Sequence, residues 1–85
     1  MRVVLTVIGQ DKVGIIAGVS NTLAECNINI ININQNIMQG FFNMVLIADM
    51  SEAAVSLQEA KEKVHALGEK LGVEIRMQSE EIFTA

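Results

Sequence analysis

The sequence GQDKVGIIAGVSNTLAECNIN occupies residues 9–29 and combines a polar loop, an amphipathic segment and the start of a strand. From Val13 to Cys26 the apolar residues recur at steps of three and four, which predicts a helix with Asp11 or Lys12 near its start. Asn27 then stands where a left-handed residue commonly ends a helix. This stretch therefore predicts a loop and a helix that connect two strands.

Apolar and β-branched residues lie on both sides of this stretch. The run Val3–Ile8 precedes the loop and is short and apolar at nearly every position, which predicts a strand buried on both faces. The run Ile28–Met38 follows the helix, but its isoleucines change phase between Ile30 and Ile31. One extra residue there restores a common face, so we expect a β-bulge in the second strand.

The second half of the chain repeats the order strand, helix, strand. Gln39-Gly40 predicts a tight hairpin turn into a third strand, Phe41–Met50, which is apolar on both faces. Ser56 and Glu59 form a capping box for a second helix, which ends at Gly72. The run Val73–Gln78 alternates apolar and polar residues, as a strand with one solvated face does.

The order βαββαβ predicts an α+β fold of the ferredoxin-like type, formed by residues 1–85 as a single domain. Right-handed crossovers place the first and third strands in the middle of a four-stranded antiparallel sheet, with two helices on one face. The apolar residues on the other face then require a partner, and we expect a homodimer or larger assembly. Two arrangements stay open, face to face or edge to edge through the second strand.

The composition excludes several classes of partner. The net charge is -4, with six Lys plus Arg against ten Asp plus Glu, so no nucleic-acid partner is expected. The apolar run Val3–Ile8 is too short to span a membrane or to form a signal-peptide core, so no membrane partner is expected. The single cysteine cannot form an internal disulfide. We therefore expect a cytoplasmic protein.

Residues with catalytic or metal-binding chemistry are few. His65 has no second histidine or neighbouring cysteine to complete a metal site, and we expect it to be a solvated surface residue. Cys26 falls on the apolar face of the first helix, as a core thiol does. No nucleophile is paired with a base. We expect no enzyme activity, no catalytic residue, no metal and no cofactor.

The glycines of the loop have two interpretations. Unpaired N–H groups at a helix start carry partial positive charge, and Gly14 lets a carboxylate or phosphate approach them. In the alternative, Gly14 and Gly18 are glycines only because helix and sheet pack tightly there. The spacing of Gly9 and Gly14 matches a P-loop, but Ile15-Ile16 replaces the Lys and Ser/Thr that contact phosphate and magnesium, so that match fails.

Polar residues of the second and third strands have simpler interpretations. Asn32, Asn34 and Asn36 alternate along the second strand and predict a polar strand face, with hydrogen bonds across an interface as the alternative. Asp49 ends the third strand, where we expect a solvated terminus.

Three motifs carry a resemblance to a known family. Asp11-Lys12-Val13-Gly14-Ile15-Ile16, Leu23-Ala24-Glu25 and Asn29-Ile30, set between an apolar strand and a hairpin, resemble an ACT domain over essentially the whole chain. The likeness is greatest to small bacterial and archaeal proteins made of one ACT domain, and more distant to glycine-cleavage-system repressors. The resemblance implies a dimeric or larger regulatory module that binds an amino acid between subunits.

The resemblance also implies where a ligand lies. In ligand-binding members the first loop and the start of the second strand line the site. In this chain the corresponding residues are Gly9, Gln10, Asp11, Lys12, Val13, Gly14 and Asn29. Serine-binding members have a histidine and an asparagine where this chain has Gly9 and Asp11, which is a departure from the serine pattern although Asn29 is kept.

Two functions follow as alternatives. In the first, a dimer binds an amino acid or a similar zwitterion, with the helix N-terminus taking the carboxylate and Asp11 the ammonium group. In the second, the exposed sheet docks a partner protein and the small-molecule ligand has been lost.

Overall fold

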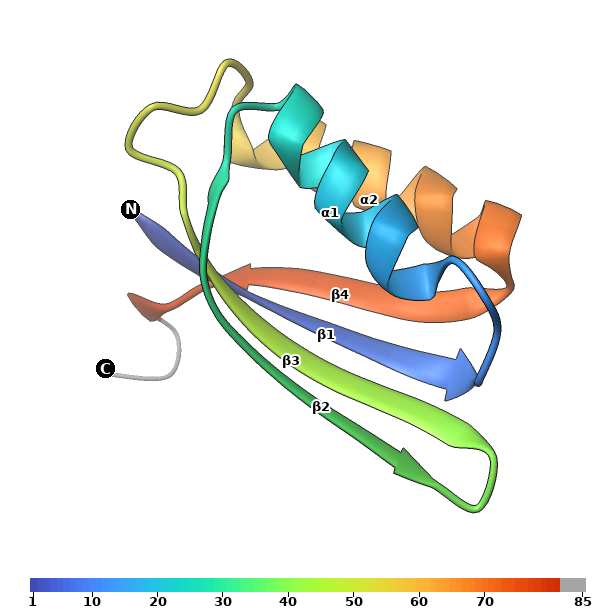
Figure 1. The fold of residues 1–85 in the computed structure, drawn as a ribbon. Coiled ribbons are helices and arrows are strands. Elements are labelled where there is room, and N and C mark those ends of the chain that lie inside the picture. The colour runs from blue at the N-terminus through green and yellow to red at the C-terminus, as the bar shows by residue number, and fades with distance from the viewer. Residues whose placement is uncertain (82–85) are drawn as a thin grey trace.

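A computed structural model describes residues 1–81 as two layers, with both helices on one face of a single sheet (Figure 1). The elements are β1 (Arg2–Gln10), α1 (Ile15–Glu25), β2 (Asn29–Met38), β3 (Phe41–Asp49), α2 (Leu57–Leu71) and β4 (Val73–Ser79). The sheet is antiparallel with the order β2-β3-β1-β4. The predicted ferredoxin-like fold is therefore confirmed. The apolar tail residues Ile82 and Phe83 lie outside the described residues.

The two ends of α1 are formed by residues with positive φ. The helix begins two residues later than the predicted Val13, because Gly14 adopts φ 96° and occupies the N-cap position. At the other end Asn27 has φ 56°, and the N–H of Ile28 donates to the carbonyl of Leu23 at 2.9 Å. This is the predicted left-handed helix end, and it turns the chain directly into β2.

The hairpin turn and the ends of α2 also follow the prediction. Gln39 and Gly40 have φ 52° and 84°, as in a two-residue type I′ turn. The Ser56 hydroxyl accepts the N–H of Glu59 at 3.1 Å, while the Glu59 carboxylate contacts that hydroxyl at 3.3 Å. Gly72 ends α2 with φ 73°. Local sequence chemistry therefore determines where these elements begin and end.

The hydrophobic core lies between the sheet and the helices. The largest fully buried side chains are Phe42, Leu5, Ile15, Leu23, Met44, Leu46, Val3, Val7, Val19, Val64 and Cys26. The prediction that the first strand is buried on both faces is wrong for a single chain. The helix-facing residues of β1 are fully buried, but Val4 and Thr6 on the other face are only half-buried and Ile8 is exposed. Two helices cover one face of the sheet and leave the other open.

The predicted bulge in β2 is present at Ile31. Ile30 pairs with Ala48 while Asn32 pairs with Ile47, so Ile31 has no partner in β3. The extra residue returns the later isoleucines to the helix side of the sheet and places the asparagines on the open face. The tip of the β2-β3 hairpin projects beyond the helices (Figure 1). Because the strand order places β2 at one edge of the sheet, its residues are nearly all exposed.

Candidate functional site

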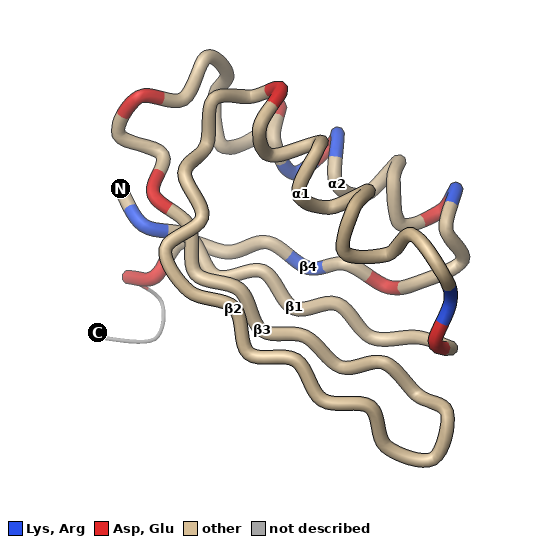
Figure 2. Tube along the Cα trace, in the orientation of Figure 1, with Lys and Arg blue, Asp and Glu red and all other residues tan. Residues whose placement is uncertain are grey.

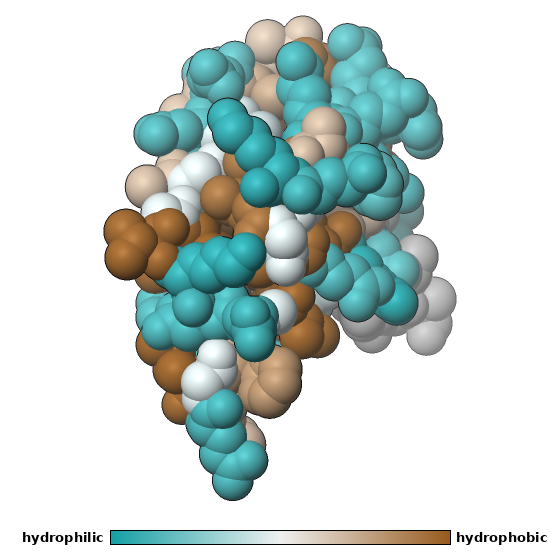
Figure 3. Space-filling view, turned by 90° about the vertical axis from the view of Figure 1, so that its right-hand side faces the viewer, coloured by the Kyte–Doolittle hydropathy of each residue, from teal (hydrophilic) through white to brown (hydrophobic). Residues whose placement is uncertain are grey.

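The loop between β1 and α1 lies at one end of the sheet, beside the β2-β3 hairpin. Residues 10–14 are all exposed. The backbone N–H of Asp11 donates to the carbonyl of Gly40 at 3.0 Å, which fixes the loop against the hairpin turn. In Figure 3, which views this end of the molecule, hydrophobic surface lies between the hydrophilic ends of the helices and the hydrophilic hairpin tip. Val13 and Ile37 are among the exposed apolar residues of the chain.

Gly14 is open to solvent rather than packed. A Cβ placed on it meets nothing within 4 Å, and its φ of 96° is one that side chains other than glycine rarely adopt. Within residues 1–81 no side chain caps the N–H groups of the first turn of α1. The tight-packing interpretation of Gly14 is therefore wrong, and the helix N-terminus is accessible.

Two other glycines do have packing roles. A Cβ on Gly9 would lie 2.6 Å from Cγ1 of Val73, so β4 requires glycine in β1 at this point. A Cβ on Gly18 would lie 3.3 Å from Leu71 and 3.4 Å from Leu67, so α1 and α2 approach each other closely there. The packing prediction for Gly18 is right in kind, but the neighbour is a helix rather than the sheet.

Lys12 has a structural partner that the sequence did not indicate. Its Nζ donates to the carbonyl of Leu71 at 3.0 Å and lies beside Gly72. A cation at the end of a helix satisfies a free carbonyl and interacts favourably with the helix dipole. Because 59 residues separate the two groups in the chain, no local pattern could have revealed this contact.

Asp11 differs from Lys12 in this respect. Its carboxylate is exposed and forms no hydrogen bond or salt bridge with any residue in the range 1–81. The loop therefore presents one carboxylate close to a helix N-terminus.

Asn29 lies at the opposite end of the sheet from this loop. It pairs with Asp49, and Asp49 pairs with Arg2 at the start of β1, whereas the loop begins after Gln10 at the end of β1. Eight residues of extended strand separate those two ends, about 26 Å at roughly 3.3 Å per residue. A single chain therefore brings together Gly9, Gln10, Asp11, Lys12, Val13 and Gly14 but not Asn29.

A hollow of about 520 Å³ adjoins Asn29. It is lined by Ala24, Asn27, Ile28, Asn29, Asp49, Ser51 and Glu52. Asp49 accepts hydrogen bonds from the hydroxyl of Ser51 at 2.6 Å and from its backbone N–H at 3.0 Å. These bonds hold the pKa of Asp49 below its usual value. Asp49 is therefore a partly exposed residue at the end of β3, as the sequence predicts, and its carboxylate is also bonded to Ser51.

His65 and Cys26 are the remaining candidates for a reactive group. His65 is exposed on α2, where its Nε2 lies 3.5 Å from Oε1 of Glu69, and Cys26 is buried. Within residues 1–81 no group of three or more His, Cys, Asp or Glu side chains is placed to hold a metal ion. No helix in the described part of the chain is both long and apolar enough to cross a membrane.

Comparison with known proteins identifies the family. Residues 1–78 match the ACT domain. The chain belongs to the ACT domain family. A UPF0237 protein of Listeria innocua is 53% identical to this ACT domain over 85 residues, which is 100% of the chain and 96% of the relative. A UPF0237 protein of Methanocaldococcus jannaschii is 48% identical over 82 residues, covering 96% of the chain and 91% of the relative.

Solved structures agree with this assignment. An ACT domain protein from Streptococcus pneumoniae has a TM-score of 0.87 at 36% identity and covers 100% of this ACT domain and 96% of that chain. The regulatory subunit of aspartate kinase from Thermus thermophilus has a TM-score of 0.70 at 25% identity, and the match covers 93% of this ACT domain and 51% of that chain. A protein described as a putative glycine cleavage system transcriptional repressor shares the fold, with a TM-score of 0.80 at 19% identity over 91% of this chain and 44% of that chain.

Proposed function

We propose that this ACT domain is a regulatory module that binds an amino acid between the two subunits of a homodimer. The observation that carries the proposal is the open N-terminus of α1, where Gly14 leaves space and no side chain of the described residues caps the N–H groups. Those N–H groups suit a carboxylate. The free carboxylate of Asp11 suits an ammonium group. A zwitterion has both charges.

The edge strand β2 supports a dimer. An edge strand exposes unpaired N–H and C=O groups, and proteins usually protect such edges with charges, proline or short length. β2 is ten residues long, and residues 26–48 contain no charged residue and no proline (Figure 2). The other edge strand, β4, is shorter and carries Glu74 and Arg76. The unprotected edge is therefore suited to pairing with a second β2.

Side-chain matching favours one register for that pairing. With Gln35 on the two-fold axis of an antiparallel pair, Ile33 lies opposite the partner's Ile37 on the helix side, and the reverse pair forms as well. These two isoleucines are 39% and 49% exposed in the single chain. Self-pairing of β2 would cover them and satisfy its free backbone groups.

The same register completes the site. In an antiparallel pair the start of one β2 lies beside the end of the other, so the partner's Asn29 reaches the turn at Gln39-Gly40. The Gly40 carbonyl accepts a hydrogen bond from the backbone N–H of Asp11, so this turn adjoins the loop. The separation of Asn29 from the loop within one chain is therefore what a site shared between two chains requires. The amide of Asn29 would donate to or accept from the ligand.

The aspartate kinase subunit noted above is described as regulatory, which agrees with a controlling rather than a catalytic role. We expect no enzyme activity from this domain. Docking of a partner protein without a ligand is the alternative.

A thermal-shift screen of the purified protein against each proteinogenic amino acid tests the proposal. A true ligand at about a hundred times its dissociation constant adds roughly 2.7 kcal/mol of stability. Asp11→Asn should weaken amino-acid binding far more than binding of the deaminated analogue, and Glu25→Gln is the matched control. Absence of any shift or calorimetric heat at millimolar concentration would favour the protein-docking alternative.

A further inference from the structure

The face of the sheet opposite the helices forms an ordered grid of side chains. Directly paired residues share a face. The rows across β2, β3, β1 and β4 are Asn32, Ile47, Val4 and Gln78; then Asn34, Val45, Thr6 and Arg76; then Asn36, Asn43, Ile8 and Glu74. Most of the two inner columns is apolar, and both outer columns are polar. Ile8 is 51% and Val45 is 47% exposed. Interfaces commonly have this arrangement of an apolar centre and a polar rim.

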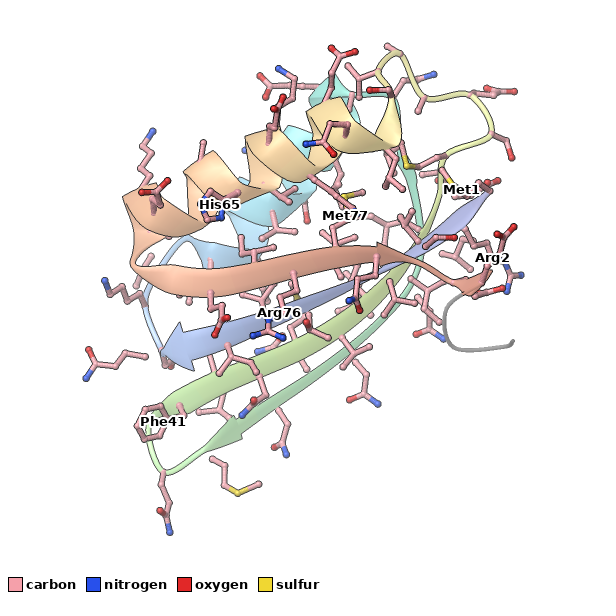
Figure 4. The ribbon with its side chains drawn as sticks, turned by 180° about the vertical axis from the view of Figure 1, so that it is seen from behind. Met1, Arg2, Phe41, His65, Arg76 and Met77 are labelled. Carbon is pink, nitrogen blue, oxygen red and sulfur yellow. The ribbon has the colours of Figure 1, made fainter. Side chains whose placement is uncertain are left out.

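The charged pair on this rim has unused bonding capacity. Both Nε and Nη2 of Arg76 donate to Oε1 of Glu74, at 3.1 and 3.0 Å. Within residues 1–81 the second carboxylate oxygen of Glu74 and Nη1 of Arg76 have no partner. Figure 4 shows Arg76 on the side of the sheet away from the helices. A positive side chain and a negative side chain two residues apart can pair with the same two side chains on a second copy of the chain.

The opposite rim is also self-complementary. Asn32, Asn34 and Asn36 form no side-chain hydrogen bond in the described part of the chain. Each amide has donors and an acceptor, so the asparagine column of one chain can bond to that of another. The rim pair of Glu74 and Arg76 is neutral as a unit, so it gives no preference for a strongly charged partner. These features favour a second copy of the chain as the occupant of the face.

The area of the face is sufficient for a specific contact. Four strands at about 4.8 Å and eight residues at roughly 3.3 Å give about 500 Å² of projected area per chain. Two stacked faces then bury on the order of 1,000 Å², which is about the lower bound for a specific interface.

We infer that two copies stack through their open faces, with β4 over the partner's β4, so that Arg76 meets the partner's Glu74. The two-fold axis of this contact runs across the strands, which brings the asparagine column of each chain over that of the other. This contact does not use the edge of β2. Edge pairing and face stacking together build a tetramer, whereas face stacking alone gives a dimer.

Light scattering of the purified protein tests the stacking. Val45→Lys places a charge in the apolar centre and should halve the number of copies in the assembly. Ala66→Lys adds the same charge at an exposed position of α2 and should leave the wild-type mass. Circular dichroism checks that both variants are folded. A folded Val45→Lys protein with the mass of wild type would overturn the inference.

Mixing two charge variants tests the proposed pairing. Arg76→Glu places four carboxylates around the axis, and Glu74→Arg places four guanidinium groups there, so each protein alone should lose half its mass. An equimolar mixture should recover the wild-type mass, because the two variants then complement each other across the contact. A mixture that keeps the mass of its components would contradict the pairing of Arg76 with the partner's Glu74.

Discussion

The Nζ of Lys12 donates a hydrogen bond to the carbonyl oxygen of Leu71 at 3.0 Å, which connects the first loop to the last residue of α2. We expect Lys12→Met to lower the free energy of unfolding by about 0.5–1 kcal/mol, because it removes this bond and a favourable charge at the helix end. Lys63→Met, at an exposed position in the same helix, is the control and should have almost no effect. Urea melts of the two variants give the comparison, and equal losses would show that the contact adds no stability.

Gly9→Ala should destabilise the sheet by about 1–3 kcal/mol, the usual cost of overpacking. The new methyl group would lie 2.6 Å from Cγ1 of Val73, so β4 must shift. Adding Val73→Ala to Gly9→Ala should recover part of the loss, which denaturant melts of the double variant measure. Purely additive losses would contradict the proposed clash.

Leu67→Ala and His65→Ala separate the two sides of α2. Leu67 packs against the core and against Gly18, so its truncation should cost about 2 kcal/mol, the low end for a leucine that is only half-buried. His65 is exposed, and its replacement should change stability by less than about half a kcal/mol. Similar unfolding midpoints of the two variants in guanidinium would show that α2 is rotated about its axis relative to this structure.

Ser51→Ala should raise the pKa of Asp49 toward its ordinary value, because both hydrogen bonds that lower this pKa come from Ser51 and the hydroxyl contributes most. A folded-state pKa below the unfolded value adds stability above the unfolded pKa, and this stability is lost as pH falls through the folded pKa. The variant should therefore lose stability at neutral pH relative to wild type, and the difference should vanish in strong acid. An NMR titration of the Asp49 carboxyl group measures the shift, with Ser20→Ala as a control that should leave it unchanged.

The fold was predictable because its boundaries depend on local chemistry. Gly40 and Asn27 tolerate the positive φ that the hairpin turn and the helix end need, and the phase change near Ile31 requires a bulge, so each feature is visible in a few adjacent residues. The apolar pattern of Val3–Ile8 predicts burial on both faces, but within a single chain only the helix side of β1 is fully buried, because both helices cover the same face of the sheet.

The candidate site was predictable only in part. The exposed loop and the open helix end follow from Gly14 and its neighbours. The bond from Lys12 to Leu71 and the close approach of Gly9 to Val73 join segments that are far apart in sequence. Such contacts depend on how the elements pack, and no local pattern reports them.

In the proposed dimer one subunit supplies the loop and the other supplies Asn29, so two variants that each disrupt one of these parts should complement each other. Asp11→Lys removes the ammonium partner, and Asn29→Leu removes the amide hydrogen bond. Each variant alone should bind the amino acid identified by the screen poorly. When the two proteins are unfolded together and refolded as a mixture, each mixed dimer should contain one intact site, and calorimetric titration should recover wild-type affinity at a reduced number of sites. A mixture that binds no better than its components would contradict a site shared between subunits.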